Sequence, residues 1–500
     1  MMRSSSPSSP PADRNLGWQA WLILALAVFA SLGGYLVYSA VAYRIGFPLD
    51  DSWIHQTYAR NLALRGEWSF IPGQVSGGST SPLWSALLAV GYWLNISPYI
   101  WTYSLGGILL FVLAVCAEAG VRSLVQDHHG ILPWAGLLVV FEWHLVWATA
   151  SGMETLLHAL LVFLVLILLM SRSDRWVVLG ALAGLSVWVR PDGLTLLGPI
   201  IFVACFASPR WTSRLRALSE IILGFGVFFL PYLLFNLLLT GTAMPTTFYA
   251  KQAEYAAWQA RPILERVGEG CLQLFTGAGI VLLPGVILSA VRFVRRKEWG
   301  GIAALLWIVG YLAMYLLRLP AYQHGRYLMP TMPILYVLGL VGYFCFIHEN
   351  KKTSGRWFLR TSWGATLLLV CSAFWFLGMK SYGDDVSLIE SEMVDSARWV
   401  AANVPEDSLV AAHDIGALGY FGEHNIVDLA GLISPEVIPF LRDETALADY
   451  LNRSEVHYLV AFPDWYHLLT ADLEPVYVTG GTYAPSVGET NMTVYRWPGP

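Results

Sequence analysis

The sequence predicts an all-α membrane domain of about eleven transmembrane helices, followed by a small C-terminal α/β domain. Hydrophobic residues make up 56% of the 500 residues and charged residues only 13%, whereas a soluble chain carries about 25% charge. Apolar runs of spanning length recur as far as residue 378, and polar sequence follows them. The net charge of −5 excludes a nucleic-acid binder that relies on a basic surface.

The polar residues 1–17, rich in Ser and Pro, predict a disordered cytoplasmic tail. Residues 18–41 are too long for the apolar core of a signal peptide and lack a convincing cleavage site, so they predict an uncleaved first span. Further spans are expected at 101–121, 131–149, 155–170, 176–190, 194–207, 217–239, 273–291, 301–317, 328–347 and 361–378.

The segment 82–94 is apolar but of marginal length, so it is either a span or a helix lying in the interface. Basic clusters at 210–216 and 292–297 share a side with the N-terminus only if this segment does not cross. We therefore expect an interfacial helix there, within or beside a long first outer loop. The N-terminus is then cytoplasmic and the C-terminus extracytoplasmic.

The chain is expected to divide into a transmembrane domain at 18–378 and an outer α/β domain at 379–500. An amphipathic pattern predicts a helix at 392–402, and helical patterns recur at 434–441 and 444–452. Short strands are expected at 409–412, 426–429, 458–462, 476–479 and 492–497. The five cysteines lie within or beside apolar stretches and form no CxxC pair, which makes a disulfide framework or a zinc ribbon unlikely for this chain.

Two adjacent carboxylates, Asp50 and Asp51, follow the first span closely. Ionisable groups at that depth tend to be functional, and one of them could act as a general base while the other positions it or ligates a cation. The alternative is that both cap a helix beginning at Ser52. Trp84, after a Gly-Gly-Ser-Thr-Ser stretch, could line a sugar site or belong to a capped interfacial helix.

Further polar residues are expected at the outer ends of spans. Glu154 could contact a cavity or stabilise a helix start, and Arg190 with Asp192 could form a self-satisfied ion pair. Lys251, beside Tyr249, could bind a lipid-linked phosphate or snorkel. The remaining candidates, which would join these residues in one outward-facing polar pocket, are His324 and Arg326.

These motifs together resemble the GT-C class of polytopic glycosyltransferases. The residues that carry the likeness are Asp-Asp in the first outer loop, Thr-Ser-Pro-Leu-Trp, Gly-Met-Glu-Thr, Arg-Pro-Asp-Gly, Pro-Thr-Thr-Phe-Tyr-Ala-Lys and Gly-Arg-Tyr. The chain is most similar to bacterial relatives of the mycobacterial terminal arabinofuranosyltransferases. It is more distantly similar to protein mannosyltransferase and lipid A aminoarabinose transferase.

The resemblance implies inverting transfer of a sugar from a polyprenyl-phosphate donor to a glycan, lipid or protein acceptor on the outer face of the plasma membrane. It places the base at Asp51 or Asp50. Lys251 and Arg326 would bind the donor phosphate, with Arg190 and His324 in reserve, while Glu154, Asp192, Trp84 and Tyr249 would line the substrate site. No metal cofactor is expected, although some relatives use a divalent cation. The alternatives are a transporter or flippase of a lipid-linked sugar and a non-catalytic scaffold.

Overall fold

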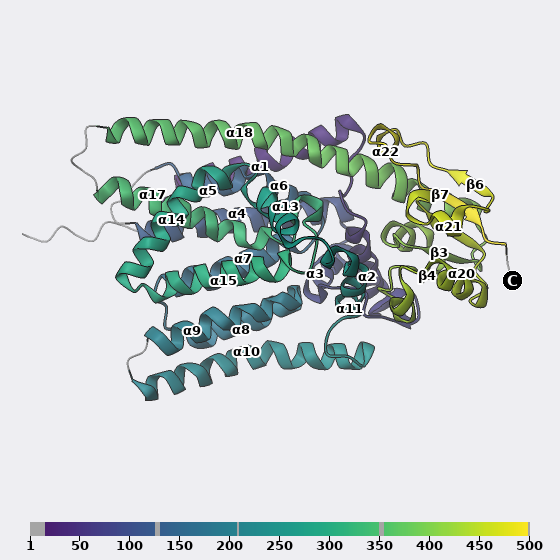
Figure 1. Ribbon diagram of the computed structural model, residues 1–500, viewed down its shortest axis with the longest axis horizontal. Coiled ribbons are helices and arrows are strands. Elements are labelled where there is room, and N and C mark those ends of the chain that lie inside the picture. Colours follow the sequence, from purple (N-terminus) through teal and green to yellow (C-terminus); the bar gives the residue numbers. More distant parts are fainter. Residues whose placement is uncertain (1–15, 126–130, 208–209, 350–354, 499–500) are drawn as a thin grey trace, which may run out of the picture.

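The computed structural model describes residues 16–125, 131–207, 210–349 and 355–498, which form a helical bundle with a small α/β unit at one end (Figure 1). The bundle consists of α1 (Trp18–Ala42), α4 (Pro98–Leu124), α5 (Trp134–Phe141), α6 (Trp143–Ala150), α7 (Thr155–Met170), α8 (Trp176–Val189), η1 (Pro191–Leu196), α9 (Leu197–Ala207), α10 (Trp211–Thr240), α14 (Ala278–Arg296), α15 (Trp299–Leu316), α17 (Met332–Glu349) and α18 (Arg356–Ile389).

Within the described ranges, seven helical segments are long and apolar enough to cross a membrane. The chain is therefore a multi-pass membrane protein, as expected. All eleven predicted spans fall mainly on helices, but α7, α8 and the η1–α9 segment are shorter apolar helices. The run predicted at 273–291 takes in the end of α13 (Ile263–Phe275) and the start of α14. The run at 131–149 is two helices, because the chain breaks at Glu142, whose carboxylate accepts a hydrogen bond from the Leu145 N–H at 3.1 Å and so caps α6.

Lipid exposure and close helix packing are both visible in α10. Ile222, Leu230 and Leu238 expose apolar side chains along this helix, which suits a surface that faces lipid tails. On its packed side, a Cβ added to Gly224 would lie 2.1 Å from the Val177 carbonyl oxygen of α8. A small residue lets two helix backbones approach this closely, as in other membrane bundles.

The bundle end beside the α/β unit carries the short elements that build the site (Figure 1). They are α2 (Asp51–Arg65), β1 (Ser69–Ile71), β2 (Gln74–Val75), α3 (Pro82–Trp93), α11 (Thr246–Glu254), α12 (Ala256–Gln259), α13 (Ile263–Phe275), α16 (Tyr322–Gly325) and η2 (Met329–Thr331). With 12 residues, α3 is too short to span a bilayer. This length agrees with the helix expected to lie in the interface.

The C-terminal unit, residues 390–498, follows α18 without an intervening linker. Its elements are η3 (Glu390–Val394), α19 (Asp395–Asn403), β3 (Leu409–Ala412), η4 (Leu418–Gly422), β4 (Asn425–Asp428), η5 (Pro435–Phe440), α20 (Glu444–Arg453), β5 (Tyr458–Ala461), η6 (Pro463–Trp465), α21 (His467–Thr470), β6 (Pro475–Val478), α22 (Tyr483–Ser486) and β7 (Thr493–Arg496). The five predicted strands and the flanking helical segments are confirmed. The domain boundary after residue 378 stays a prediction, since α18 runs across it, and residues 1–15 of the expected tail lie outside the described residues.

The five strands form one sheet in the order β4-β3-β5-β7-β6. Strands β4, β3 and β5 are parallel, and β7 and β6 add antiparallel strands at the other edge. Alternate residues face opposite sides, as strand geometry requires. Val410 packs into the core shared with α19 and the bundle, whereas Ala411 packs against α20 and α21. The carboxyl ends of β3, β4 and β5 lie at one edge, which is where parallel sheets usually bind ligands.

Candidate functional site

A cavity of about 920 Å³ lies between the bundle end and the C-terminal unit. Its bundle wall comes from the start of α2, from α11 and α12, and from residues 322–326, the turn that precedes α17. Its opposite wall comes from the loops that follow β3, β4 and β5, at the carboxyl ends of the parallel strands. Of the predicted site residues, the cavity is lined by Asp50, Asp51, Lys251 and Arg326.

Asp50 joins the two halves of the molecule. Its two carboxylate oxygens accept hydrogen bonds from the backbone N–H groups of Gly416 at 2.6 Å and Ala417 at 2.8 Å. It precedes α2 but makes no side-chain capping bond to that helix, so the capping alternative does not describe it. Burial raises the pKa of Asp50 to about 6, although these two N–H groups act in the opposite direction.

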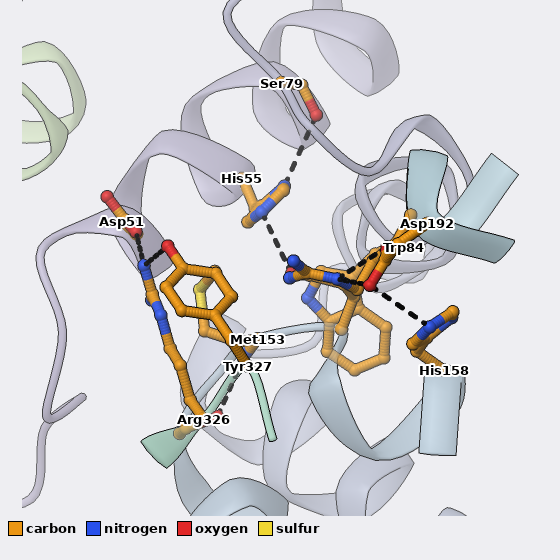
Figure 2. A network of polar contacts seen from close by, with 12 residues as sticks. Asp51, His55, Ser79, Trp84, Met153, His158, Asp192, Arg326 and Tyr327 are labelled. Carbon is orange, nitrogen blue, oxygen red and sulfur yellow. Dashed lines mark hydrogen bonds and ion pairs between the residues drawn. The ribbon is translucent and has the colours of Figure 1, made fainter. Parts of the chain in front are cut away.

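Asp51 lies one residue further, at the first position of α2, and faces a different partner. Its Oδ2 accepts a hydrogen bond from the Arg326 guanidinium at 2.6 Å (Figure 2). Burial raises the pKa of Asp51, but the charges of Arg326 and Lys251 outweigh it and lower that pKa to about 2. The adjacent carboxylates therefore occupy unlike environments.

Lys251 and Arg326 meet at the hydroxyl of Tyr327. Lys251 donates to this oxygen at 3.1 Å, and Arg326 donates to it at 3.0 Å. Both cations also lie over the Tyr327 ring, 5.5 and 5.0 Å from its centroid. Arg326 is 5% exposed, and its Nε and Nη1 are buried without a hydrogen-bond partner in the described part of the chain. Two strong donors of a buried cation thus remain available to an anionic ligand.

A second polar network lies beside Tyr327 (Figure 2), and its residues Arg190, Glu154, Asp192 and His158 do not line the cavity. Arg190 donates to Glu154 at 2.8 Å and to Asp192 at 3.1 Å, which forms the ion pair considered from the sequence. Arg190 also lies 5.1 Å from the Tyr327 ring centroid. His158 Nε2 is 3.6 Å from an oxygen of Asp192. The charges of Arg190 are therefore already balanced by buried carboxylates.

The Glu154 carboxylate is nearly inaccessible and does not line the cavity. Its second oxygen is 3.4 Å from His55 Nε2, on the α2 face that also carries Asp51. On its other side, His55 Nδ1 contacts the hydroxyl of Ser85 at 2.9 Å. Glu154 thereby ties α2 to Arg190 inside the bundle.

His324 does not line the cavity. Its Nε2 pairs with Asp385 of α18 at 2.7 Å, and its ring packs edge-on to Trp147 at 5.2 Å. Gln323, His324 and Gly325 have consecutive positive φ angles of 52°, 57° and 68°. Such strain is retained where the surroundings determine the backbone. Here the turn directly precedes Arg326.

None of the four residues predicted to line the substrate site lines this cavity: Glu154 and Asp192 belong to the second network, and Trp84 and Tyr249 lie elsewhere. Trp84 is 2% exposed and donates from Nε1 to the Gly152 carbonyl at 2.8 Å, so it packs α3 against the bundle. Tyr249 is 41% exposed on α11 and packs edge-on to Phe248. Both residues were predicted to line the site because they lie in motifs of the sequence. Their direction could not be read from sequence, because each helix presents several faces.

The C-terminal wall contains residues to which the sequence alone assigned no catalytic role. His413 and Asp414, directly after β3, line the cavity opposite Asp51. His413 Nδ1 contacts the Tyr466 hydroxyl at 2.7 Å, and burial lowers the pKa of His413 to about 4, so its ring is neutral near pH 7. Burial, together with the charges of Asp50 and Asp51, raises the pKa of Asp414 well above its usual range. The sequence signal that could have singled out His413 and Asp414 was their position directly after a predicted strand.

The residues of this cavity do not fit a dedicated metal site. No group of three or more His, Cys, Asp or Glu side chains suited to a metal ion occurs in the described ranges. Both oxygens of Asp50 are engaged by backbone N–H groups, and Asp51 is paired with Arg326.

Comparisons with known proteins bear on the fold. A family model described as a domain of unknown function, DUF8728, matches residues 385–495. A search of curated proteins found no match. Among solved structures, ArnT from Cupriavidus metallidurans bound to undecaprenyl phosphate has a TM-score of 0.56 at 15% identity, over 96% of this chain and 98% of that chain. Its apo state has a TM-score of 0.59 at 15% identity, over 95% and 97%.

The oligosaccharyltransferase of Archaeoglobus fulgidus, solved in complex with zinc and sulfate, has a TM-score of 0.60 at 13% identity. The similarity covers 89% of this chain and 68% of that chain. ArnT and the archaeal enzyme are both GT-C glycosyltransferases. The chain therefore has the GT-C fold across its membrane part and its C-terminal unit, and at the level of fold the resemblance drawn from its motifs is confirmed.

Proposed function

We propose that this chain, with its GT-C fold, transfers a sugar from a polyprenyl-phosphate carrier to an acceptor at the membrane face where the C-terminal unit lies. The single observation that carries the proposal is the meeting of Asp51, Lys251 and Arg326 at one cavity wall. In the sequence, Lys251 lies 200 positions after Asp51, and Arg326 lies 75 positions after Lys251. A carboxylate beside two cations at a membrane boundary suits a base next to a leaving phosphate. A similar fold solved with undecaprenyl phosphate supports this class of donor.

The donor phosphate is assigned to Lys251 and Arg326. Arg326 can pair with Asp51 through Nη2 while its unpartnered Nε and Nη1 engage phosphate oxygens. Lys251 adds a compact charge that can move from the Tyr327 hydroxyl to the phosphate. Arg190 is left out of this assignment because buried carboxylates already balance its charge.

His324 is also left out, because its Nε2 is engaged by Asp385 and its ring lies between aromatic side chains. We assign it to the turn that aims Arg326 toward Asp51. This leaves a donor site of two cations, both of which contact Tyr327.

The general base is assigned to Asp51. Both oxygens of Asp50 are occupied by backbone N–H groups, whereas Asp51 has one oxygen free of hydrogen bonds among the described contacts. Without donor, the two cations keep Asp51 a weak base, as its low pKa indicates. A bound phosphate offsets those cations and raises the pKa of Asp51, so the base becomes stronger when donor is present.

The transfer step then balances as an inverting displacement. The acceptor oxygen forms a bond to the anomeric carbon of the sugar as its proton passes to Asp51. The bond between the anomeric carbon and the phosphate oxygen breaks on the opposite face, and polyprenyl phosphate leaves with the electron pair. Lys251 and Arg326 neutralise the charge that develops on the phosphate.

The test is release of polyprenyl phosphate from a panel of polyprenyl-phosphate sugars by purified protein. We expect Asp51→Asn to abolish turnover while retaining donor binding, and Lys251→Ala and Arg326→Ala to weaken donor binding. Asp174→Asn is the matched control, since Asp174 is exposed in the loop after α7, a full helix length from the site. Full rates in both cation variants at low donor concentration would refute the phosphate assignment. Flux of the carrier through liposomes, without release, would identify a transporter instead.

A further inference from the structure

The outer half of the cavity contains an exposed tryptophan that is held in place. Trp465 follows β5 and is 49% exposed while lining the cavity. The His413 ring meets it edge-on, with centroids 5.4 Å apart and planes at 87°, and Phe462 packs against it at 5.2 Å. His413 is fixed in turn by the Tyr466 hydroxyl at 2.7 Å. The indole face is therefore preorganised but uncovered.

A second tryptophan lines the same cavity from α12 of the membrane part. Trp258 is 6% exposed, and its Nε1 is buried without a hydrogen-bond partner among the residues the structure describes. Arg261 lies over its ring, 4.9 Å from the centroid. A buried N–H without an acceptor is costly, so the site suits a ligand that brings an oxygen to it.

The charged residues around these two rings are of both signs. Arg442 and Arg261 line this half of the cavity together with Asp464, Glu489 and Glu254. A mixed rim has no preference for a strongly anionic or cationic ligand, but its side chains can donate to and accept from hydroxyl groups. The Asp464 carboxylate is oriented by Thr490, which donates to it from its backbone N–H and its hydroxyl at 3.0 and 2.7 Å.

We infer that this half of the cavity is an acceptor subsite for a neutral glycan, which lies against the Trp465 face and presents a hydroxyl to Asp51. An apolar sugar face suits an exposed indole, and the equatorial hydroxyls suit the mixed rim and the Trp258 N–H. The role of this glycan as the acceptor rests on the transfer reaction proposed above. Binding of the glycan itself does not depend on that reaction.

The first experiment measures binding without donor. Full-length protein in nanodiscs is titrated by calorimetry with three neutral probes: α-1,6-mannotetraose, α-1,5-arabinotetraose and maltotetraose. We expect at least one probe to bind, Trp465→Ala to weaken it roughly tenfold, and Trp465→Phe to restore most of the affinity. A tenfold loss corresponds to about 60 Å² of apolar contact at 25 cal/mol/Å². Leu468→Ala is the matched control, because Leu468 is exposed, lies three residues away and does not line the cavity.

The second experiment measures transfer to the bound probe from a donor that releases polyprenyl phosphate. We expect Trp465→Ala to raise the acceptor KM roughly tenfold with little change in the donor KM. Probe binding that depends on Trp465 supports the glycan site even if no donor is turned over, in which case the proposed transfer fails alone. No binding of any probe, or equal affinity in wild type and Trp465→Ala, overturns the inference, as does transfer only to a lipid or a peptide.

Discussion

Replacing Asp50 by Asn should loosen the C-terminal unit from the bundle without removing the base. The carboxylate accepts one N–H bond on each oxygen, at 2.6 and 2.8 Å. An asparagine of the same shape keeps one acceptor and turns an NH2 group toward the other N–H. One hydrogen bond to a charged group is then lost, which costs about 1.5–3 kcal/mol.

The assay is hydrogen exchange of the amides of Gly416 and Ala417, read by mass spectrometry on a peptide that covers them. The lost bond corresponds to exchange faster by roughly 10- to 150-fold, since each factor of ten is about 1.4 kcal/mol. Asp51→Asn should lower the transfer rate but leave this exchange unchanged, because Asp51 contacts Arg326 instead. Asp464→Asn, which also removes a carboxylate with two hydrogen bonds, is the control. Wild-type exchange in Asp50→Asn would show that this carboxylate does not hold the two halves together.

Three further outcomes follow from the same geometry. Gly416→Ala places a Cβ 2.0 Å from the Asp50 carbonyl oxygen, so the same peptide should exchange faster; unchanged exchange would contradict that close approach. The charge of Arg326 helps to hold the pKa of Asp51 near 2, so Arg326→Gln should raise this pKa and move the acid limb of the kcat/KM profile to higher pH. Acid limbs at the same pH in wild type and Arg326→Gln would count against Asp51 as the base. Arg44→Ala leaves Glu390 buried without its partner at 2.8 Å and should cost about 3 kcal/mol of stability, visible as a lower Tm.

The C-terminal strands could be predicted almost residue by residue. Strand β3 begins and ends where the short apolar run Leu409–Ala412 does, since such a run is a local property. The order β4-β3-β5-β7-β6 was not predicted, because pairing between distant strands leaves no local trace. The position of His413 and Asp414 at the carboxyl ends of parallel strands depends on that order. This is why the sequence indicated the strand before them but not their place in the cavity.

The membrane part shows the same division between local and distant information. Hydropathy located every apolar run, but it did not reveal the break at Glu142, which depends on one side chain capping the next helix. The adjacent residues Asp50 and Asp51 look equivalent in sequence. They differ in structure because their partners, Gly416 and Arg326, lie hundreds of residues away. Trp84 ends the Thr-Ser-Pro-Leu-Trp motif, yet its ring is packed inside the protein.

The hydrogen bond between Asp50 and Gly416 has a consequence for the timing of biogenesis. The two residues are 366 positions apart. A ribosome adding 5–20 residues per second reaches the second partner roughly 20 to 70 s after the first. During that interval the rest of the first outer loop and the later membrane helices are made one after another, while one wall of the cavity does not yet exist. A nascent chain therefore has no complete cavity for a lipid-linked sugar until its last unit has been synthesised, translocated and docked.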